Sequence, residues 1–148
     1  MPDHRELRAV LDTDVLVSGL MGVKSPPRRI VDGWLEGPFT LVTSLHLVGE
    51  LAHVLGYPRI AKRIRLDRTD VDMILAALLS QAEVVPGELE LTGVTPDPKD
   101  DAVVACAVEG QADYLVSGDE DLLVLHVYQG TQVVTPRRFL EILRKEEA

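Results

Sequence analysis

Residues 97–123 read "DPKDDAVVACAVEGQADYLVSGDEDLL", and this stretch carries the pattern from which we predict the fold. Residues 100–111 are apolar on nearly all sides, which is typical of a buried helix that ends at Gly110. The following residues, from Asp113 to Leu125, indicate a short apolar strand, a Ser-Gly-Asp turn and a short helix. A buried helix that leads directly into a buried strand is typical of a sheet covered by helices.

The same alternation of strands and helices continues in both directions along the chain. Further apolar strands are predicted at residues 9–12, 39–44, 82–85 and 133–135. Helices are predicted at residues 14–21, 25–37, 45–55, 58–66 and 69–81, and from Pro136 onward. Thr69 or Asp70 is the expected cap of the fifth of these helices, and residues 86–99, rich in Pro and Gly, are expected to form a loop. We therefore predict an α/β protein, a single-domain α/β/α sandwich over residues 1–148 with a central, mostly parallel five-stranded sheet.

Composition limits the classes of protein to which the chain can belong. It has 148 residues, 46% of them hydrophobic, which suits one domain with its own core, and we expect a soluble, cytoplasmic protein. The single cysteine, Cys106, excludes a disulfide framework and a cysteine-rich zinc site within one chain, and we expect it to be a buried, inert thiol. A formal net charge of −9 argues against a general nucleic-acid coat, unless several of the 24 acidic residues gather around divalent cations.

Acidic residues follow the predicted strands at positions that should meet at one edge of the sheet. Asp12 and Asp14 follow the first strand, Asp119 and Asp121 follow the strand before the Ser-Gly-Asp turn, and Asp100 and Asp101 begin the buried helix. Ligands bind beyond the carboxyl ends of parallel strands, so we expect these carboxylates to converge there. Helix capping explains an Asp at each of these positions taken singly, but it does not explain their convergence.

A fourth segment adds one more carboxylate. In the helix predicted at residues 45–55, Leu47, Leu51 and Leu55 share a buried stripe, and Glu50 lies at its margin. Converging carboxylates without cysteine or a clear histidine set are hard oxygen ligands, which suit Mg²⁺ or Mn²⁺. Such a site can hydrolyse a phosphodiester with one ion or two.

Four stretches of the chain resemble the PIN-domain ribonucleases, in particular the VapC-like toxins of toxin–antitoxin pairs. They are "VLDTDVLVSGL", "SLHLVGELAHVL", "DPKDDAVVACAVEGQADYLVSGDEDLL" and "VVTPRRFLEIL". The resemblance implies a metal-dependent endoribonuclease that hydrolyses RNA with one or two Mg²⁺ or Mn²⁺ ions. It also implies a homodimer and an antitoxin protein as a partner.

The resemblance assigns roles to individual residues. It makes four acids the metal-binding and catalytic residues, namely Asp12, Glu50, Asp101 and Asp119. Ser117 takes the position of a small hydroxyl near the site, and supporting roles fall to Asp14, Asp100 and Asp121, with Asp97 as a further candidate. Asp14 stands where the family often has Asn, so its role is open between capping a helix and supporting the site.

Two other functions remain as alternatives. The first is a haloacid-dehalogenase-like phosphatase, whose Asp-x-Asp nucleophile motif is approached by "DTD" at residues 12–14. Leu16 and Leu123 depart from that family's motifs, and Lys99 is the sole candidate for its phosphate-binding lysine. The second is a catalytically inactive PIN-like module that binds a partner. An inactive binding module should show no saturable Mn²⁺ binding. A phosphatase should hydrolyse small phosphomonoesters, which a nuclease ignores.

The densest basic stretch of the chain lies at residues 58–68. It contains Arg59, Lys62, Arg63 and Arg65, which we predict to contact RNA phosphates or an acidic segment of a partner. Arg28 and Arg29 form a second basic pair. A solvated helix face explains the stretch equally well.

Overall fold

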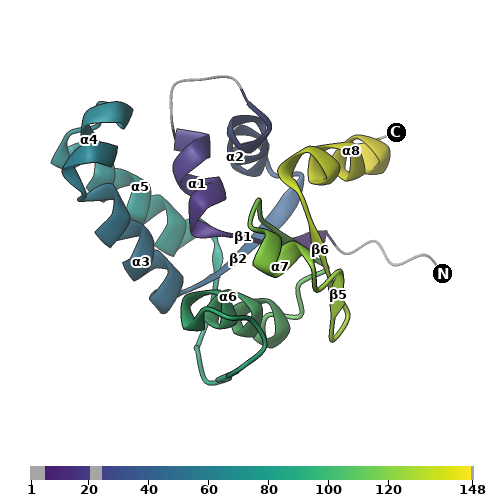
Figure 1. Ribbon diagram of the computed structural model, residues 1–148. Helices are drawn as coiled ribbons and strands as arrows, with labels where there is room; N and C mark the ends of the chain where they lie inside the picture. Colours follow the sequence, from purple (N-terminus) through teal and green to yellow (C-terminus); the bar gives the residue numbers. More distant parts are fainter. Residues whose placement is uncertain (1–5, 21–24, 148) are drawn as a thin grey trace.

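A six-stranded sheet forms the centre of the molecule in the computed structural model, which describes residues 6–20 and 25–147 (Figure 1). The strands are β1 (Leu7–Leu11), β2 (Phe39–Ser44), β3 (Glu83–Val85), β4 (Tyr114–Val116), β5 (Val127–Tyr128) and β6 (Thr131–Val134). Their order across the sheet is β3-β2-β1-β4-β6-β5, and every pair is parallel except β5 with β6. The predicted mixed α/β fold with a mostly parallel sheet is confirmed, but the prediction of five strands was wrong. The two residues of β5 form a short hairpin with β6, and two residues carry no periodicity that a sequence could reveal.

Helices connect the strands and cover both faces of the sheet. They are α1 (Thr13–Leu20), α2 (Pro26–Glu36), α3 (Leu45–Leu55), α4 (Pro58–Ile64), α5 (Arg68–Gln81), α6 (Pro98–Glu109), α7 (Glu120–Leu123) and α8 (Pro136–Glu147). Each predicted helix is present, and no predicted end differs from the observed one by more than two residues. The last residue predicted for the first helix, Met21, lies outside the described residues.

Side chains at the helix ends explain where two of these helices begin. The cap of α5 is Asp67, whose carboxylate accepts a hydrogen bond from the Asp70 backbone N–H while the Asp70 carboxylate accepts one from the Asp67 N–H. The prediction of Thr69 or Asp70 as the cap was therefore wrong by two or three residues. Helix α6 begins at Pro98, after the cap Asp97, so that it includes two residues that we predicted to be loop.

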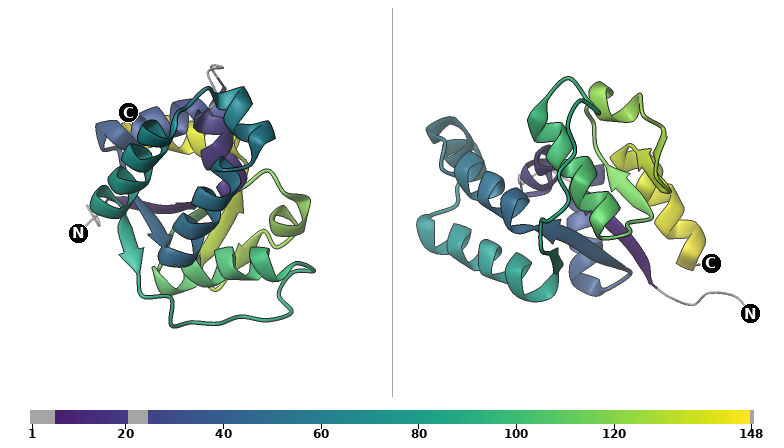
Figure 2. Two further views of the ribbon diagram at one scale, coloured as in Figure 1. Left: turned by 90° about the vertical axis from the view of Figure 1, so that its left-hand side faces the viewer. Right: turned by 90° about the horizontal axis from the view of Figure 1, so that it is seen from below.

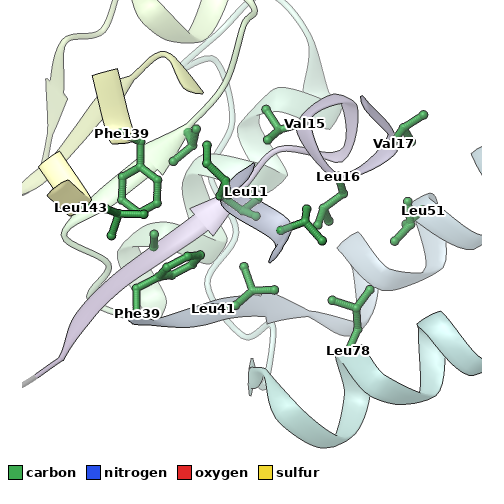
Figure 3. Close-up of a cluster of buried hydrophobic side chains, with 14 of the residues drawn as sticks. Leu11, Val15, Leu16, Val17, Phe39, Leu41, Leu51, Leu78, Phe139 and Leu143 are labelled. Carbon is green, nitrogen blue, oxygen red and sulfur yellow. The ribbon is translucent and has the colours of Figure 1, made fainter. Parts of the chain in front are cut away.

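Two hydrophobic cores, one on each face of the sheet, hold the helices in place. Alternate residues of β1 point to opposite faces, so that Ala9 and Leu11 join one core and Val10 the other. The first core packs α1, α2, α3, α5 and α8 against the sheet and contains Phe39 and Phe139, whose rings meet edge to face at 5.2 Å (Figure 3). The second core packs α6 and α7 on the opposite side, where Figure 2 shows α6 apart from α1, α2 and α8.

The contact between α6 and the sheet depends on a glycine. A Cβ atom at Gly110, directly after α6, would lie 2.4 Å from a side-chain carbon of Val42 on β2. Cys106, on the same helix, is buried as predicted, and burial raises the pKa of its thiol to about 12. The thiol therefore stays protonated and unreactive at neutral pH.

The strand order places one edge of the sheet at a switch in direction. From β1 the chain adds β2 and β3 on one side and β4 and β6 on the other, so the switch lies between the carboxyl ends of β1 and β4. Leu11 pairs with Val116 at these ends, and the next residues are Asp12 and Ser117. The fold thus brings the first acidic residue and the Ser-Gly-Asp turn to the position where open α/β sheets bind ligands.

Within the described residues, no helix has the length and apolar character needed to cross a membrane.

Candidate metal centre

A buried serine joins the ends of β1 and β4. Ser117 is fully buried, and its Oγ donates a hydrogen bond of 2.8 Å to Oδ2 of Asp12. The same Oγ accepts a hydrogen bond of 3.0 Å from the backbone N–H of Asp119. The backbone N–H of Asp12 donates to the carbonyl oxygen of Val116 at 3.0 Å, so both strands fix the position of Asp12. The sequence prediction that Ser117 lies near the acidic residues agrees with this geometry.

Three further aspartates bring carboxylate oxygens together beside this pair. Asp100, Asp119 and Asp121 each offer one oxygen, and these oxygens lie within 4.8 Å of one another. Asp119 caps α7 and accepts a hydrogen bond of 2.9 Å from the backbone N–H of Asp121. Asp100 reaches the group from the first turn of α6, where it is buried, whereas Asp121 is exposed.

The pKa of Asp12 is raised because the sequence places this carboxyl group inside the protein. Asp12 is only 7% exposed, and its pKa is raised to about 6, mainly by burial. The hydrogen bonds from Ser117 and from the Thr13 backbone lower this pKa, while the neighbouring charges of Asp14 and Asp119 act in the same direction as burial. The ionised form of Asp12 is therefore costly without a positive charge nearby.

The pKa of Asp100 is raised even more, to about 7. Burial is the largest cause, followed by the charges of Asp119 and Asp12, a hydrogen bond between the carboxyl groups of Asp100 and Asp119, and the charge of Asp97. Repulsion between Asp100, Asp119 and Asp12 shows that these three groups share one electrostatic site.

No basic side chain in the described part of the chain offsets this charge. The ion pairs between described residues are Arg8–Glu83, Arg28–Asp32 and Arg138–Glu141, and none of them includes one of the converging aspartates or Asp12. Converging carboxylate oxygens with raised pKa values and without a cationic partner fit a hard divalent cation such as Mg²⁺ or Mn²⁺. We call Asp12, Asp100, Asp119 and Asp121 the acidic cluster.

Asp101, which the family resemblance assigned to the metal, makes different contacts. Its carboxylate accepts hydrogen bonds from the backbone N–H of Thr95 at 2.7 Å, from Thr95 Oγ1 at 3.0 Å and from the Gly93 N–H at 3.1 Å. The group of converging carboxylates found among the described residues contains Asp100 instead. Successive side chains on a helix point about 100° apart, so the two adjacent aspartates face different neighbours.

A second acid of α6 holds the other end of the same loop. The Glu109 carboxylate accepts hydrogen bonds from the backbone N–H groups of Gly87, Glu88 and Leu89 at 3.1–3.3 Å. Glu109 and Asp101 together attach the loop between β3 and α6 to that helix at two points. The sequence analysis did not identify this role of Asp101 and Glu109, and their spacing of eight residues on one helix was its only signal.

Asp14 and Glu50 lie on the helices that follow β1 and β2, outside the group of converging oxygens found among the described residues. Glu50 is half-buried on α3, at the margin of the stripe formed by Leu47 and Leu51, as predicted. Asp14 is exposed in the first turn of α1 and acts on Asp12 through its charge. The first hydrogen bonds of α1 go to the carbonyl oxygen of Asp12, from the N–H groups of Val15 and Leu16.

The predicted basic contacts lie on and directly after α4. Arg59, Lys62, Arg63 and Arg65 are all exposed, and Arg65 ends the helix with a φ of 60°. Their exposure leaves them accessible to a ligand, and their contact with RNA or a partner stays a prediction.

Comparison with known proteins places the chain in a family. No curated protein matches it. The model of the family described as PIN domain matches residues 8–121, which is more than half of the chain and includes Asp12, Asp100, Asp119 and Asp121. The chain therefore belongs to the PIN-domain family.

Proposed function

We propose that the protein is a Mg²⁺- or Mn²⁺-dependent endoribonuclease that hydrolyses phosphodiester bonds in RNA. PIN domains are generally nucleases, and family membership supports a nucleic-acid substrate. The observation that carries the proposal is the convergence of Asp100, Asp119 and Asp121 beside the buried Asp12, with no basic partner among the described residues. A phosphodiester is itself negatively charged, so the cluster needs a cation before it can accept this substrate.

The proposed roles of the residues follow from their contacts. Asp12, Asp100 and Asp119 hold the cation, and Asp121 supports them from the exposed side. When bound, the cation supplies the positive charge that polarises a phosphodiester and lowers the pKa of water. Ser117 is a positioning residue, because its hydroxyl orients Asp12 and the backbone of Asp119 at the same time.

Of the four acids assigned by resemblance, the proposal replaces Asp101 and keeps Glu50. We propose that Asp100 binds the cation in place of Asp101, because the Asp101 carboxylate is occupied by Thr95 and Gly93. We keep Glu50 as the fourth acid of the site. Helix α3 begins directly after β2, the neighbour of β1, and the Glu50 side chain on this helix is half-buried.

The resemblance to VapC-like toxins extends the proposal to partners. We propose that the protein is the toxin of a toxin–antitoxin pair, that it forms a homodimer, and that it acts on RNA in the cytoplasm. The exposed basic residues of α4 support binding of an acidic antitoxin segment.

An RNA cleavage assay with purified protein tests the proposed activity. Wild type should cleave RNA in Mn²⁺ or Mg²⁺ and lose activity in EDTA, and Asp12→Asn should be inactive while keeping its fold. The matched control is Asp72→Asn, which removes an exposed carboxylate from α5. Full activity of Asp12→Asn would refute the proposal.

The same preparation separates the two alternatives. A haloacid-dehalogenase-like phosphatase would hydrolyse p-nitrophenyl phosphate, which a nuclease leaves intact. A catalytically inactive module would cleave neither substrate and would show no saturable Mn²⁺ binding.

A further inference from the structure

Three arginines that the proposed activity does not use line one hollow of the surface. The hollow has a volume of about 330 Å³ and lies between the start of α2 and one face of α8. Arg29 comes from α2, and Arg137 and Arg144 come from α8. Figure 1 shows α2 and α8 side by side, and the two helices pack directly against each other. We call this hollow the arginine groove.

The spacing of the arginines follows from helix geometry. Arg137 and Arg144 are seven residues apart, which is nearly two full turns, so both side chains share one face of α8 at a separation of about 10 Å along the axis. Leu140 and Glu141 lie between them on the same face. On α2, Arg29 lies one turn beyond Ser25, which also lines the groove. The groove therefore receives positive charge from both helices.

The charge balance of the groove is positive although the whole chain carries −9. Among the described residues, no ion pair involves Arg29, Arg137 or Arg144. The carboxylate in the groove, Glu141, is bound by Arg138 at 3.1 Å. Three exposed guanidinium groups in one concave site are typical of phosphate recognition, because each can donate two parallel hydrogen bonds to a phosphate.

The groove begins at the same edge of the sheet as the acidic cluster. The carbonyl oxygen of Val134, at the end of β6, accepts a hydrogen bond of 3.0 Å from the Ser117 N–H, and Arg137 follows three residues later. Only β4 separates β6 from β1, so the ends of β1 and β6 lie about 10 Å apart. A single strand of nucleic acid held at the cluster can thus continue into the groove within a few nucleotides.

We propose that the arginine groove binds backbone phosphates of the RNA strand whose cleaved bond lies at the acidic cluster. This inference rests on the proposed function, because the ligand is assigned from a nucleic-acid substrate. Contacts to phosphates carry no information about base sequence, so the groove contributes affinity and orientation. An acidic protein segment is the competing ligand, and the experiment distinguishes it.

The experiment measures binding of a fluorescein-labelled single-stranded RNA by fluorescence anisotropy at several KCl concentrations in Mg²⁺. All variants are made in the Asp12→Asn background so that the RNA stays intact. Each phosphate contact to a single strand contributes about −0.7 to the slope of log K against log salt concentration. We expect Arg29→Gln/Arg137→Gln/Arg144→Gln to reduce the magnitude of the slope by about 2, and each single variant to reduce it by about 0.7.

Two neighbouring residues provide matched controls. Arg28→Gln removes the same charge one residue away from Arg29, but its guanidinium is bound to Asp32 and does not line the groove, so the slope should stay unchanged. Glu141→Gln removes the negative charge within the groove and should tighten RNA binding. Because the three groove arginines are exposed, thermal unfolding of their variants should match that of the parent protein.

Each outcome decides the inference independently of the nuclease activity. An unchanged slope in the triple variant would overturn it, and so would an equal loss for Arg28→Gln and Arg29→Gln. Loss of binding to an acidic peptide with RNA binding intact would also overturn it, in favour of a protein partner. If the wild type binds RNA through the groove but fails to cleave it, the groove stands and the proposed activity fails.

Discussion

Replacing either of two adjacent aspartates on α6 should have opposite effects on stability and on metal binding. Asp100 is buried beside other carboxylates, and its pKa rises from 3.8 to about 7 on folding. At pH 8 the folded, metal-free protein therefore carries a charge that burial and repulsion make costly. Asp100→Asn removes this charge and should stabilise the metal-free protein while it abolishes Mn²⁺ binding.

The size of the effect follows from the pKa. A rise from 3.8 to about 7 corresponds to about 4 kcal/mol, at about 1.4 kcal/mol for each pKa unit. The edge of the sheet is open to water, which reduces the penalty, and we expect a gain of about 2 kcal/mol, or about 5 °C in Tm. Because the folded protein binds this proton more tightly than the unfolded chain, metal-free stability should fall as the pH rises from about 4 to about 7. Asp100→Asn should reduce this fall.

Asp101→Asn provides the matched comparison. Its carboxylate accepts three hydrogen bonds from Thr95 and Gly93, and loss of its charge should cost about 1.5–3 kcal/mol. Mn²⁺ binding should persist in this variant. Stability is measured by urea unfolding at pH 8 in EDTA, and metal binding is measured by calorimetric titration with Mn²⁺ in the absence of EDTA. The reasoning is refuted if Asp100→Asn destabilises the protein, or if Asp101→Asn loses Mn²⁺ binding while Asp100→Asn retains it.

Three further predictions concern the same region. Mn²⁺ affinity should fall as the pH is lowered from 8 to 5.5. The reason is that Asp12 and Asp100, with pKa values of about 6 and about 7, must lose protons to bind a cation. Equal affinity across this range, measured by calorimetry, would contradict the assignment. Ser117→Ala should weaken Mn²⁺ binding about 10-fold, since Asp12 loses a hydrogen bond that favours its charged form. Unchanged Mn²⁺ affinity in a folded variant would exclude a positioning role for Ser117. The buried thiol of Cys106, with a pKa of about 12, should react with a thiol reagent such as dithiobis-nitrobenzoate only after unfolding in urea. Rapid reaction in the native protein would show that α6 is less buried than described.

The sequence predicted the position of the acidic edge because strand ends are readable from it. Asp12 follows the apolar run of β1, and Asp119 follows that of β4 through a Ser-Gly-Asp turn. Parallel strands bring their carboxyl ends to one edge, so the proximity of these residues did not depend on details of packing.

The choice between Asp100 and Asp101 could not be made from the sequence. One step along a helix turns a side chain by about 100°, and the boundary of the helix was predicted two residues late. Which aspartate faces the cluster depends on where α6 begins and on the loop that it anchors, and both are set by long-range contacts. The pairing of α2 with α8 was equally hidden, because more than 100 residues separate Arg29 from Arg137.

Calorimetric titration with Mn²⁺ at pH 8 tests most directly whether the acidic cluster is a metal centre. We predict saturable binding to the wild type, loss of binding in Asp119→Asn, and binding close to that of the wild type in the control Asp72→Asn. An absence of saturable binding to the wild type, or undiminished binding to Asp119→Asn, would contradict the assignment of the metal to the carboxylates at the ends of β1 and β4.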